Sequence, residues 1–445
     1  MKPYSFVLPE SFHPGEFLTS PALLCRWDDA RYFVSLILTK LARRDVDDLG
    51  VVRLRAEHLK NIMYQVTYAD VIDALRQGGA VERFPYQVGE RPFGFRLAAR
   101  FVADKHVRVP ATDSRLIGRL AAFHDQQEAE RLSRMQPVHL ALAQQQHRLR
   151  IHGHEARRTL ENLPATCNPF DVQGILVRDI ENHEFRCNVG RFGRLSNNIS
   201  SLKRELRESL HVDGEPLGFV DLSCAQPALL AKVIRDSENG KQGTDGDRQR
   251  EGEQSKGKYD SSPGHRNGVE WDGWANYLSL VQTGRFYDFM VGQLRDSDIG
   301  RDEFKRRFLA DVIAKKGRYP SIVEDVFQRL FPSVYGFIRR MNRDGCEHAN
   351  LIRLLHRAES QIVIETVAAD LVTRFPSVFF LTLHDCIFTT NEHLGKVEQA
   401  FRRAFDQTGF RMQFKVERGN SSRGSHVTTD RQYEQPRIDA PPVRL

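Results

Sequence analysis

Apolar residues recur at helical spacing through most of the first hundred residues. The segment 30–44 (ARYFVSLILTKLARR) is apolar along one face, which predicts an amphipathic helix. Two further helices are expected in LRAEHLKNIM and YADVIDALRQ, and the second should stop at Gly78 and Gly79. Two short apolar runs follow, one on each side of a turn signal at residues 89–92, so a β-hairpin is expected there.

This order of helices and hairpin resembles a winged helix-turn-helix, in which the second helix enters a groove of nucleic acid and the hairpin touches the backbone. The same order also fits a helical domain with a ribbon and no nucleic-acid role. We therefore expect a mainly helical, winged-helix-like domain over residues 1–100, with its partner left open. Residues 101–185 are polar and helical in pattern, and Pro137 should separate two of their helices.

Two segments are too polar to fold by themselves. Residues 236–268 hold one large apolar side chain, Tyr259, among charges, glycine and serine, and residues 416–445 have a similar character. Such segments bury too little apolar surface to offset the loss of chain entropy on folding. We expect a disordered insertion at 236–268 and a disordered tail at 416–445.

The chemistry begins after about residue 186. An apolar run at 217–220 ends in Asp221 and is followed at once by a helical pattern, and a β-prone run at 378–383 ends in His384 and Asp385. Either acid alone is commonplace at a strand end. Two aspartates on adjacent strands, however, can hold two Mg²⁺ ions for an in-line phosphoryl displacement, because water and substrate phosphates complete the coordination of the metal.

Basic residues accompany both aspartates. Between them, in RDEFKRRFLADVI (301–313), Arg301, Lys305 and Phe308 have the spacing of one helix face. Two cations there would neutralise a triphosphate while the aromatic ring stacks on a base. The segment also fits an ordinary amphipathic helix whose Phe304, Phe308 and Leu309 pack inward.

The ordered set of motifs resembles the palm and fingers of A-family DNA polymerases over residues 186–415. The matching segments, in chain order, are Gly193-Arg194-Leu195-Ser196 for the family's TGRLSS, Asp221-Leu222-Ser223-Cys224-Ala225-Gln226 for motif A, Arg301-x-x-x-Lys305 for motif B and His384-Asp385 for motif C. The resemblance implies an α+β right hand, with an antiparallel palm sheet, helical fingers and a small helical thumb within 101–185.

The resemblance also implies the roles of individual residues. Two Mg²⁺ ions would be held by Asp221, Asp385 and the backbone carbonyl of Leu222. The incoming dNTP would meet Arg301, Lys305, Phe308 and Gln226, with Lys305 counted among the catalytic residues. Primer-template DNA would contact Arg194, Arg204, Arg207 and His384.

Departures from the family pattern keep other functions open. Gln226 and Cys386 stand where the family has glutamates in motifs A and C, and the Asp-x-Ser-Cys and His-Asp pairs are shared with single-subunit phage-type RNA polymerases. A primase or RNA polymerase that uses NTPs, with a DNA or RNA template, is therefore one alternative, and a non-catalytic DNA-binding replication initiator is another. The region before residue 186 shows no proofreading motif, which suits a short polymerase that replicates a plasmid, phage or mobile element.

Composition adds only broad limits. The excess of 65 Lys and Arg over 58 Asp and Glu gives a formal charge of +7, which is compatible with a polyanionic partner. Six scattered cysteines without a CxxC pair are typical of reduced thiols in a cytoplasm. No apolar run of about 18 residues is present, so no membrane span is expected.

Overall fold

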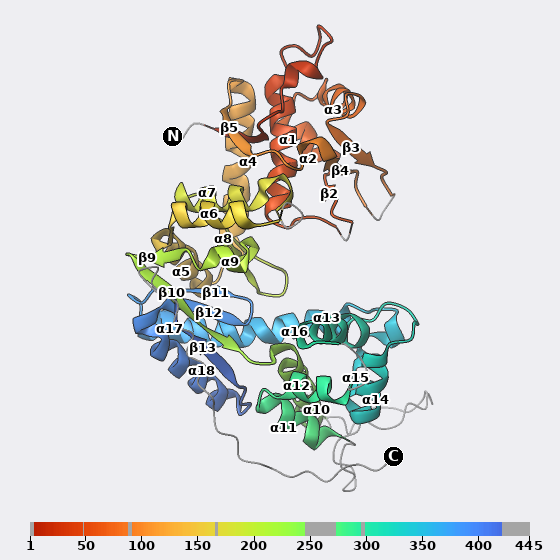
Figure 1. Ribbon diagram of the computed structural model, residues 1–445, viewed down its shortest axis with the longest axis vertical. Helices are drawn as coiled ribbons and strands as arrows, with labels where there is room; N and C mark the ends of the chain where they lie inside the picture. The colour runs from red at the N-terminus through yellow and green to blue at the C-terminus, as the bar shows by residue number, and fades with distance from the viewer. Residues whose placement is uncertain are drawn as a thin grey trace.

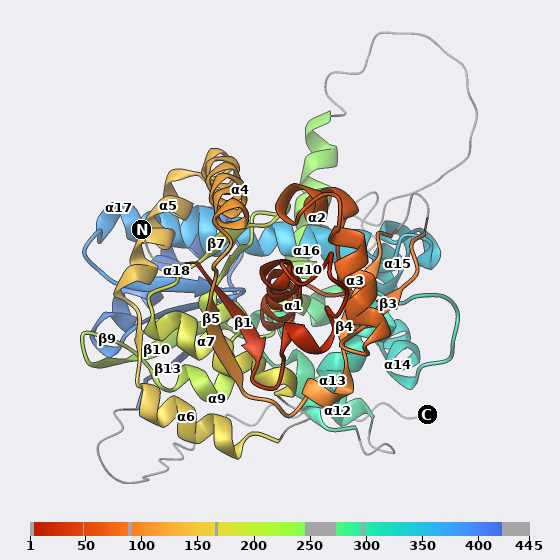
Figure 2. The ribbon, with the colours of Figure 1, turned by 90° about the horizontal axis from the view of Figure 1, so that it is seen from above.

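The computed structural model describes residues 4–47, 49–87, 91–164, 168–244, 273–294 and 299–420. Within these ranges the protein is α+β, because its sheets are antiparallel and its helices gather in separate regions instead of alternating with strands. The search of the same residues finds no helix with the length and apolar character that a membrane crossing requires. The N-terminal elements lie at one end of the long axis (Figure 1) and stand in front of the other elements when the molecule is seen from that end (Figure 2).

The N-terminal elements surround one buried helix. They are β1 (Ser5–Pro9), α1 (Trp27–Ala42), β2 (Val52–Arg53), α2 (Ala56–Ile62), α3 (Tyr68–Gln77), β3 (Val81–Phe84), β4 (Gly94–Leu97) and β5 (His106–Pro110). Strand β1 pairs with β5, while β2, β4 and β3 form a second sheet in that order. Helix α1 contacts α3, β2 and β4. The predicted helices and hairpin are confirmed, and α3 ends before Gly78 and Gly79, where the φ angle of Gly79 is +69°.

Four helices connect this region to the central sheet. They are α4 (Ser114–Ser133), α5 (Pro137–Gln145), α6 (Gly153–Asn162) and α7 (Val172–Glu181). Pro137 is the first residue of α5, so the predicted separation of two helices at this proline is confirmed. The short elements β7 (Cys187–Val189), β8 (Leu195–Asn197), α8 (Asn198–Ser201) and α9 (Arg204–Arg207) follow.

The central sheet has six antiparallel strands. They are β6 (Arg150–Ile151), β9 (Leu210–Val212), β10 (Glu215–Leu222), β11 (Phe380–Leu383), β12 (Cys386–Thr390) and β13 (Phe414–Glu417). Their order is β11-β12-β10-β9-β6, and β13 pairs with β10 on the same edge as β9. Strands from the middle and the end of the chain thus become neighbours.

Two hydrophobic cores cover the two faces of this sheet. Phe380 and Ile387 point into one core with the C-terminal helices, whereas Leu381, Leu383 and Phe388 belong to the other core, shared with the N-terminal elements. Because both faces are covered, consecutive apolar residues of β11 and of β12 are buried on opposite faces of the sheet. The predicted domain boundaries near residues 100 and 185 stay predictions, and the second core extends across both positions.

The remaining helices enclose one side of the sheet. They are α10 (Ala225–Thr244), α11 (Trp274–Gln282), α12 (Phe286–Gln293), α13 (Arg301–Arg307), the π-helix η6 (Phe308–Ile313), α14 (Ile322–Leu330), α15 (Pro332–Met341), α16 (Asn350–Ser360), the π-helix η8 (Gln361–Ala368), α17 (Ala369–Arg374) and α18 (Leu394–Thr408). Figure 1 shows α16 running from the sheet toward α13 and α15. Helices α11 to α15 meet around a cluster of aromatic rings that includes Tyr277, Phe286, Phe308, Phe327 and Phe331.

The predicted boundaries of the two polar segments need correction. Helix α10 continues to Thr244, so residues 236–244 are helical; an ion pair between Lys232 and Asp236, four residues apart, favours this extension. Residues 245–268 lie outside the described residues. At the other end, β13 includes residues 416 and 417 because the strand pairs with β10, and residues 421–445 lie outside the described part.

The aromatic cluster should dominate the stability of helices α11 to α15. Replacement of fully buried Phe327 with alanine removes a ring that contacts several others, so we expect unfolding free energy to fall by about 3–5 kcal/mol. The measurement is denaturant unfolding followed by fluorescence. Gln328→Ala, at the exposed neighbouring position, should change stability by less than about 0.5 kcal/mol. Equal losses in both variants would contradict this assignment of the core.

Candidate active site

Asp221 lies on β10, and Asp385 lies beside it in the turn that leads into the neighbouring strand β12. Asp221 is near the end of β10 and pairs in register with Cys386, the first residue of β12. The amide of Leu222 donates a hydrogen bond to the carbonyl of Asp385 at 3.2 Å. The two carboxylates, far apart in sequence, therefore belong to one edge of the central sheet.

Two tight turns next to these aspartates adopt backbone conformations that side-chain-bearing residues rarely take. His384 opens the two-residue turn between β11 and β12 with a φ of +54°, and Cys224 joins β10 to α10 with a φ of +51°. A left-handed first residue matches the twist of a two-residue hairpin, but it costs free energy in a residue with a Cβ. The Cys224 thiol donates a hydrogen bond to the carbonyl of Gly284 at 3.1 Å, which ties its turn to the start of α12.

The electrostatics of the site are those of two acids forced together. Burial, followed by the charges of Asp385 and Glu417, raises the pKa of Asp221 to about 7, while Lys305 and Lys415 oppose this rise. Burial also raises the pKa of Asp385, against the opposing charges of Arg194 and Lys305. Lys305 is thus close enough to influence both carboxylates.

The donor set fits Mg²⁺ better than a metal held only by protein. Among the described residues, no three His, Cys, Asp or Glu side chains converge into a metal cluster. Mg²⁺ needs few carboxylates when water and phosphate oxygens supply its other ligands. A divalent cation would also relieve the repulsion that raises the pKa of Asp221.

Of the three residues in the segment 301–313 that were predicted to bind a nucleotide, two are exposed to solvent. Arg301 and Lys305 are both exposed on α13, and Arg301 forms an ion pair with Asp288 at 3.2 Å. Burial raises the pKa of Tyr287 and of Cys224, and the charge of Arg301 opposes both rises, which places this charge near the turn after Asp221.

The assignment of Phe308 to nucleotide binding is wrong. Its side chain is 1% exposed and packs against the rings of Phe286 and Phe327, with centroid distances of 5.2 and 5.3 Å. Phe308 lies four residues after buried Phe304 and therefore continues the inward face of the helix. Leu309, four residues after Lys305, is 40% exposed and continues the outward face instead, so the inward packing also considered for Leu309 is wrong.

Arg194 follows a glycine whose backbone packs closely against side chains of α16. Gly193 has a φ of +81°, and a Cβ there would lie 2.9 Å from Nη1 of Arg357 and 3.3 Å from Cβ of Ser360. This contact lets Arg194 form an ion pair with Glu359 at the end of α16. Glu359 is 1% exposed, and burial raises its pKa to about 7 although Arg194 opposes the shift.

A group of arginines faces the hairpin turn next to Asp385. Burial and the charges of Arg194, Arg207 and Arg44 lower the pKa of His384, so its imidazole is neutral at pH 7. Arg204 lies near Arg207 and helps to lower its pKa. Three separate parts of the chain thus build one basic surface, which we call the arginine group: Arg44, Arg194, Arg204 and Arg207.

Four residues of this neighbourhood were missed by the sequence analysis: Arg44, Glu359, Lys415 and Glu417. Glu359 carried a usable signal, because it lies on the apolar face of a helix with Leu355 and Ile362, where a carboxylate needs a buried partner. Lys415 and Glu417 form an ion pair on β13 beside Asp221, and nothing in their local sequence indicates that position. Leu222 is buried, and Gln226 is partly buried in the first turn of α10.

Comparisons with known proteins add little to this description. No protein-family model and no curated protein matches the chain. Among solved structures, it is similar to one described as the POL domain of Pol1 from M. smegmatis in complex with DNA primer-template and dNTP, with 14% sequence identity and a TM-score of 0.32. The match covers 57% of this chain and half of that chain. A likeness of this size carries no argument, so the site is interpreted from its own geometry.

The raised pKa of Asp221 makes stability depend on pH. Because the folded state binds a proton at Asp221 that the unfolded state releases, stability should fall as pH rises from about 4 to about 7 when no divalent cation is present. Asp221→Asn removes this loss. Its free energy of unfolding should match that of the wild type near pH 4 and exceed it near pH 8 by an amount on the order of 1 kcal/mol, after allowing for the partial exposure of the carboxylate. Its melting temperature should therefore equal that of the wild type near pH 4 and be higher near pH 8.

Thermal melts in EDTA across this range measure the effect. Asp325→Asn, at an exposed position on α14, serves as the control and should follow the wild type at every pH. A pH-independent difference between Asp221→Asn and the wild type would show that Asp221 does not titrate as described.

Proposed function

We propose that the protein is a template-directed nucleotidyltransferase, namely a short A-family-like DNA polymerase without proofreading. The observation that carries this proposal is the pair of partly buried aspartates, Asp221 on β10 and Asp385 in the turn that leads into the neighbouring strand β12, with Lys305 near both. Two repelling carboxylates beside a cation-bearing helix suit a reaction in which a metal-bound triphosphate enters the site.

In this proposal Asp221, Asp385 and the carbonyl of Leu222 hold two Mg²⁺ ions. When bound, such ions would supply positive charge beside the reacting phosphate oxygens. Lys305 and Arg301 bind the phosphates of the incoming dNTP, and Gln226 borders its sugar. Glu359 positions Arg194, which contacts primer-template DNA together with Arg204, Arg207 and neutral His384.

The N-terminal elements suggest a second DNA contact. We propose that β2, α2, α3, β3 and β4 act as a winged helix-turn-helix, supported by two short helices that precede a hairpin whose strand β4 lies between β2 and β3. This arrangement also favours the second candidate function, a non-catalytic replication initiator. Such a protein would bind duplex DNA through residues 53–98 and would show no nucleotide incorporation.

The choice of sugar is tested by one assay. Purified protein is given primed and unprimed templates of DNA or RNA with either dNTPs or NTPs. Extension of primers by dNTPs supports the proposal, whereas incorporation of NTPs alone without a primer would favour the primase or RNA polymerase alternative, for which Gln226 in place of a motif A glutamate is the supporting observation. Absence of incorporation with every combination would favour the initiator.

Asp221→Asn and Asp385→Asn should each abolish synthesis. Loss of one metal-binding carboxylate removes several kcal/mol of charge stabilisation, so the rate of primer extension should fall by roughly a thousandfold or more. Circular dichroism and primer-template binding in EDTA should remain close to wild type. Asp325→Asn is again the matched control and should keep full activity. Retention of most activity in either site variant would refute the catalytic assignment.

Lys305→Ala should weaken nucleotide use more than DNA binding. Removal of one charge-assisted contact with the triphosphate should raise the apparent KM for dNTP by about tenfold or more. Arg306→Ala removes a charge at the adjacent exposed position and provides the comparison. Steady-state primer extension at varied dNTP concentrations measures both variants, and an unchanged KM for Lys305→Ala would contradict the assigned role.

A further inference from the structure

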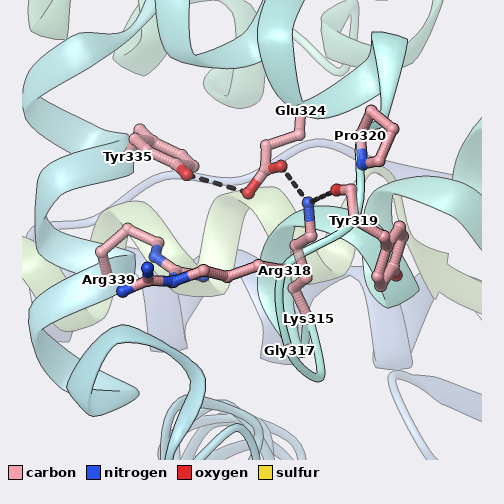
Figure 3. Close-up of a pocket in the computed structure, with 8 residues that line it drawn as sticks. All are labelled: Lys315, Gly317, Arg318, Tyr319, Pro320, Glu324, Tyr335 and Arg339. Atoms are coloured by element: carbon pink, nitrogen blue, oxygen red, sulfur yellow. Dashed lines mark hydrogen bonds and ion pairs between the residues drawn. The ribbon is translucent and has the colours of Figure 1, made fainter.

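A cavity of about 380 Å³ lies beyond the far end of the helix that carries Lys305. Its lining comes from the loop after η6 and from helices α14 and α15: Lys315, Gly317, Arg318, Tyr319, Pro320, Glu324, Tyr335 and Arg339 (Figure 3). Lys315 lies ten positions after Lys305, just beyond the end of η6 at Ile313. The residues that line the cavity include neither aspartate nor Lys305, so the cavity is a separate site.

The floor of the cavity is electrically balanced. Buried Lys315 donates to a carboxylate oxygen of Glu324 and to the carbonyl of Tyr319. The other oxygen of Glu324 accepts a hydrogen bond from the hydroxyl of Tyr335 at 2.8 Å. Figure 3 shows this chain of contacts across the back of the cavity. Both carboxylate oxygens of Glu324, the acidic residue of the lining, therefore already accept hydrogen bonds from Lys315 and Tyr335.

The walls carry positive charge that is not balanced. Arg318 is exposed and has no ion pair or hydrogen bond with another described residue. Arg339 has a side chain only 17% exposed, and its contact with Asp344 is a long 3.7 Å to a carboxylate that is 78% exposed. Figure 3 shows Arg318 extending toward Arg339, so two guanidinium groups face the same space. Such a pair of like charges favours an anion between them.

The loop is held rigid before any ligand arrives. The hydroxyl of Tyr319 donates to Asp311 at 2.9 Å, and the hydroxyl of Ser321 donates to the other oxygen of the same carboxylate at 2.7 Å. Gly317 makes the turn with a φ of +75°. Tyr319 remains 42% exposed at the rim, where an aromatic ring can stack with a base. Two cations beside an exposed ring on a loop that is held in place suit a nucleotide of a single strand.

We propose that this cavity binds a phosphodiester of single-stranded nucleic acid, with the phosphate between Arg318 and Arg339 and the adjoining base against Tyr319. The inference rests on the proposed function for the identity of the strand, which is the unpaired template ahead of the aspartate pair. The volume accommodates one nucleotide, and a free nucleotide or pyrophosphate would offer the same phosphate chemistry.

The experiment measures binding by fluorescence anisotropy in EDTA, so that no synthesis occurs. One labelled duplex has a single-stranded 5′ overhang of about eight nucleotides, and an otherwise identical duplex is blunt. Arg318→Gln/Arg339→Gln should bind the overhang duplex about tenfold more weakly than wild type and should bind the blunt duplex equally well. The slope of log affinity against log salt for the overhang duplex should decrease in magnitude by about 0.7, as expected when the one phosphate held by both arginines is no longer neutralised.

A matched control distinguishes an effect of the cavity from the effect of removing two positive charges anywhere on the surface. Arg329→Gln/Arg340→Gln removes the same charge from exposed positions on α14 and α15 that do not line the cavity, and it should retain the wild-type preference for the overhang. Equal weakening in both double variants, or no weakening in the first, would overturn the proposal. If Arg339→Gln lowers the melting temperature, Arg318→Gln alone, at an exposed loop position, carries the same test.

Competition identifies the source of the phosphate. Unlabelled single-stranded oligonucleotide should displace the overhang duplex, whereas inorganic pyrophosphate and dNTP should not do so in EDTA. Displacement by pyrophosphate from the wild type but not from Arg318→Gln/Arg339→Gln would assign the cavity to a free phosphate ligand and overturn the single-strand proposal. Because catalysis is not measured, these outcomes are independent of primer extension: an active polymerase without an overhang effect refutes the cavity proposal alone.

Discussion

The constraint on which the rest of the structure depends is the confinement of two carboxylates at one edge of a sheet. Asp221 and Asp385 would separate if their strands were free, because burial and mutual repulsion both disfavour their ionised forms. The register between β10 and β12 and the two strained turns keep them together. Three cations lie near the pair and neutralise only part of its negative charge: Lys305, Arg194 and Lys415. In the proposed function, a divalent metal and a polyphosphate would balance the charge that remains.

The ion pair between Arg194 and Glu359 holds the arginine in a fixed position relative to α16. A buried ion pair seldom adds stability beyond what apolar packing would provide, but it fixes the partners in one relative position. Here the position depends on Gly193, because its backbone has a φ of +81°, which is strained in any residue that carries a side chain. One glycine and one buried acid therefore orient an arginine toward the hairpin turn, and the same helix leads toward α13 and α15 (Figure 1).

Local patterns in the sequence predicted a good part of this arrangement and failed for identifiable reasons. The helices and hairpin of the first hundred residues, the break at Pro137 and the strands that end in aspartates follow from periodicity and turn residues, which act locally. Phe308 failed because periodicity shows which residues share a helix face but not which face packs inward. Arg44 and Glu417 were missed because their neighbours are distant in sequence. The end of α10 was placed too early because an i to i+4 ion pair sustains a helix in a segment without apolar residues.

The covering of the central sheet on both faces ties the first third of the chain to the chemistry. Leu381, Leu383 and Phe388, which flank the turn that bears Asp385, are shielded from water by a core that includes α1 and β1. A shortened protein that kept only the sheet and its C-terminal helices would present these side chains as a continuous apolar surface, and such surfaces drive self-association. Substitutions that adapt the N-terminal elements to a new partner are therefore limited to their outer face. Their inner face must stay apolar because it packs against β11 and β12, the strands on either side of Asp385.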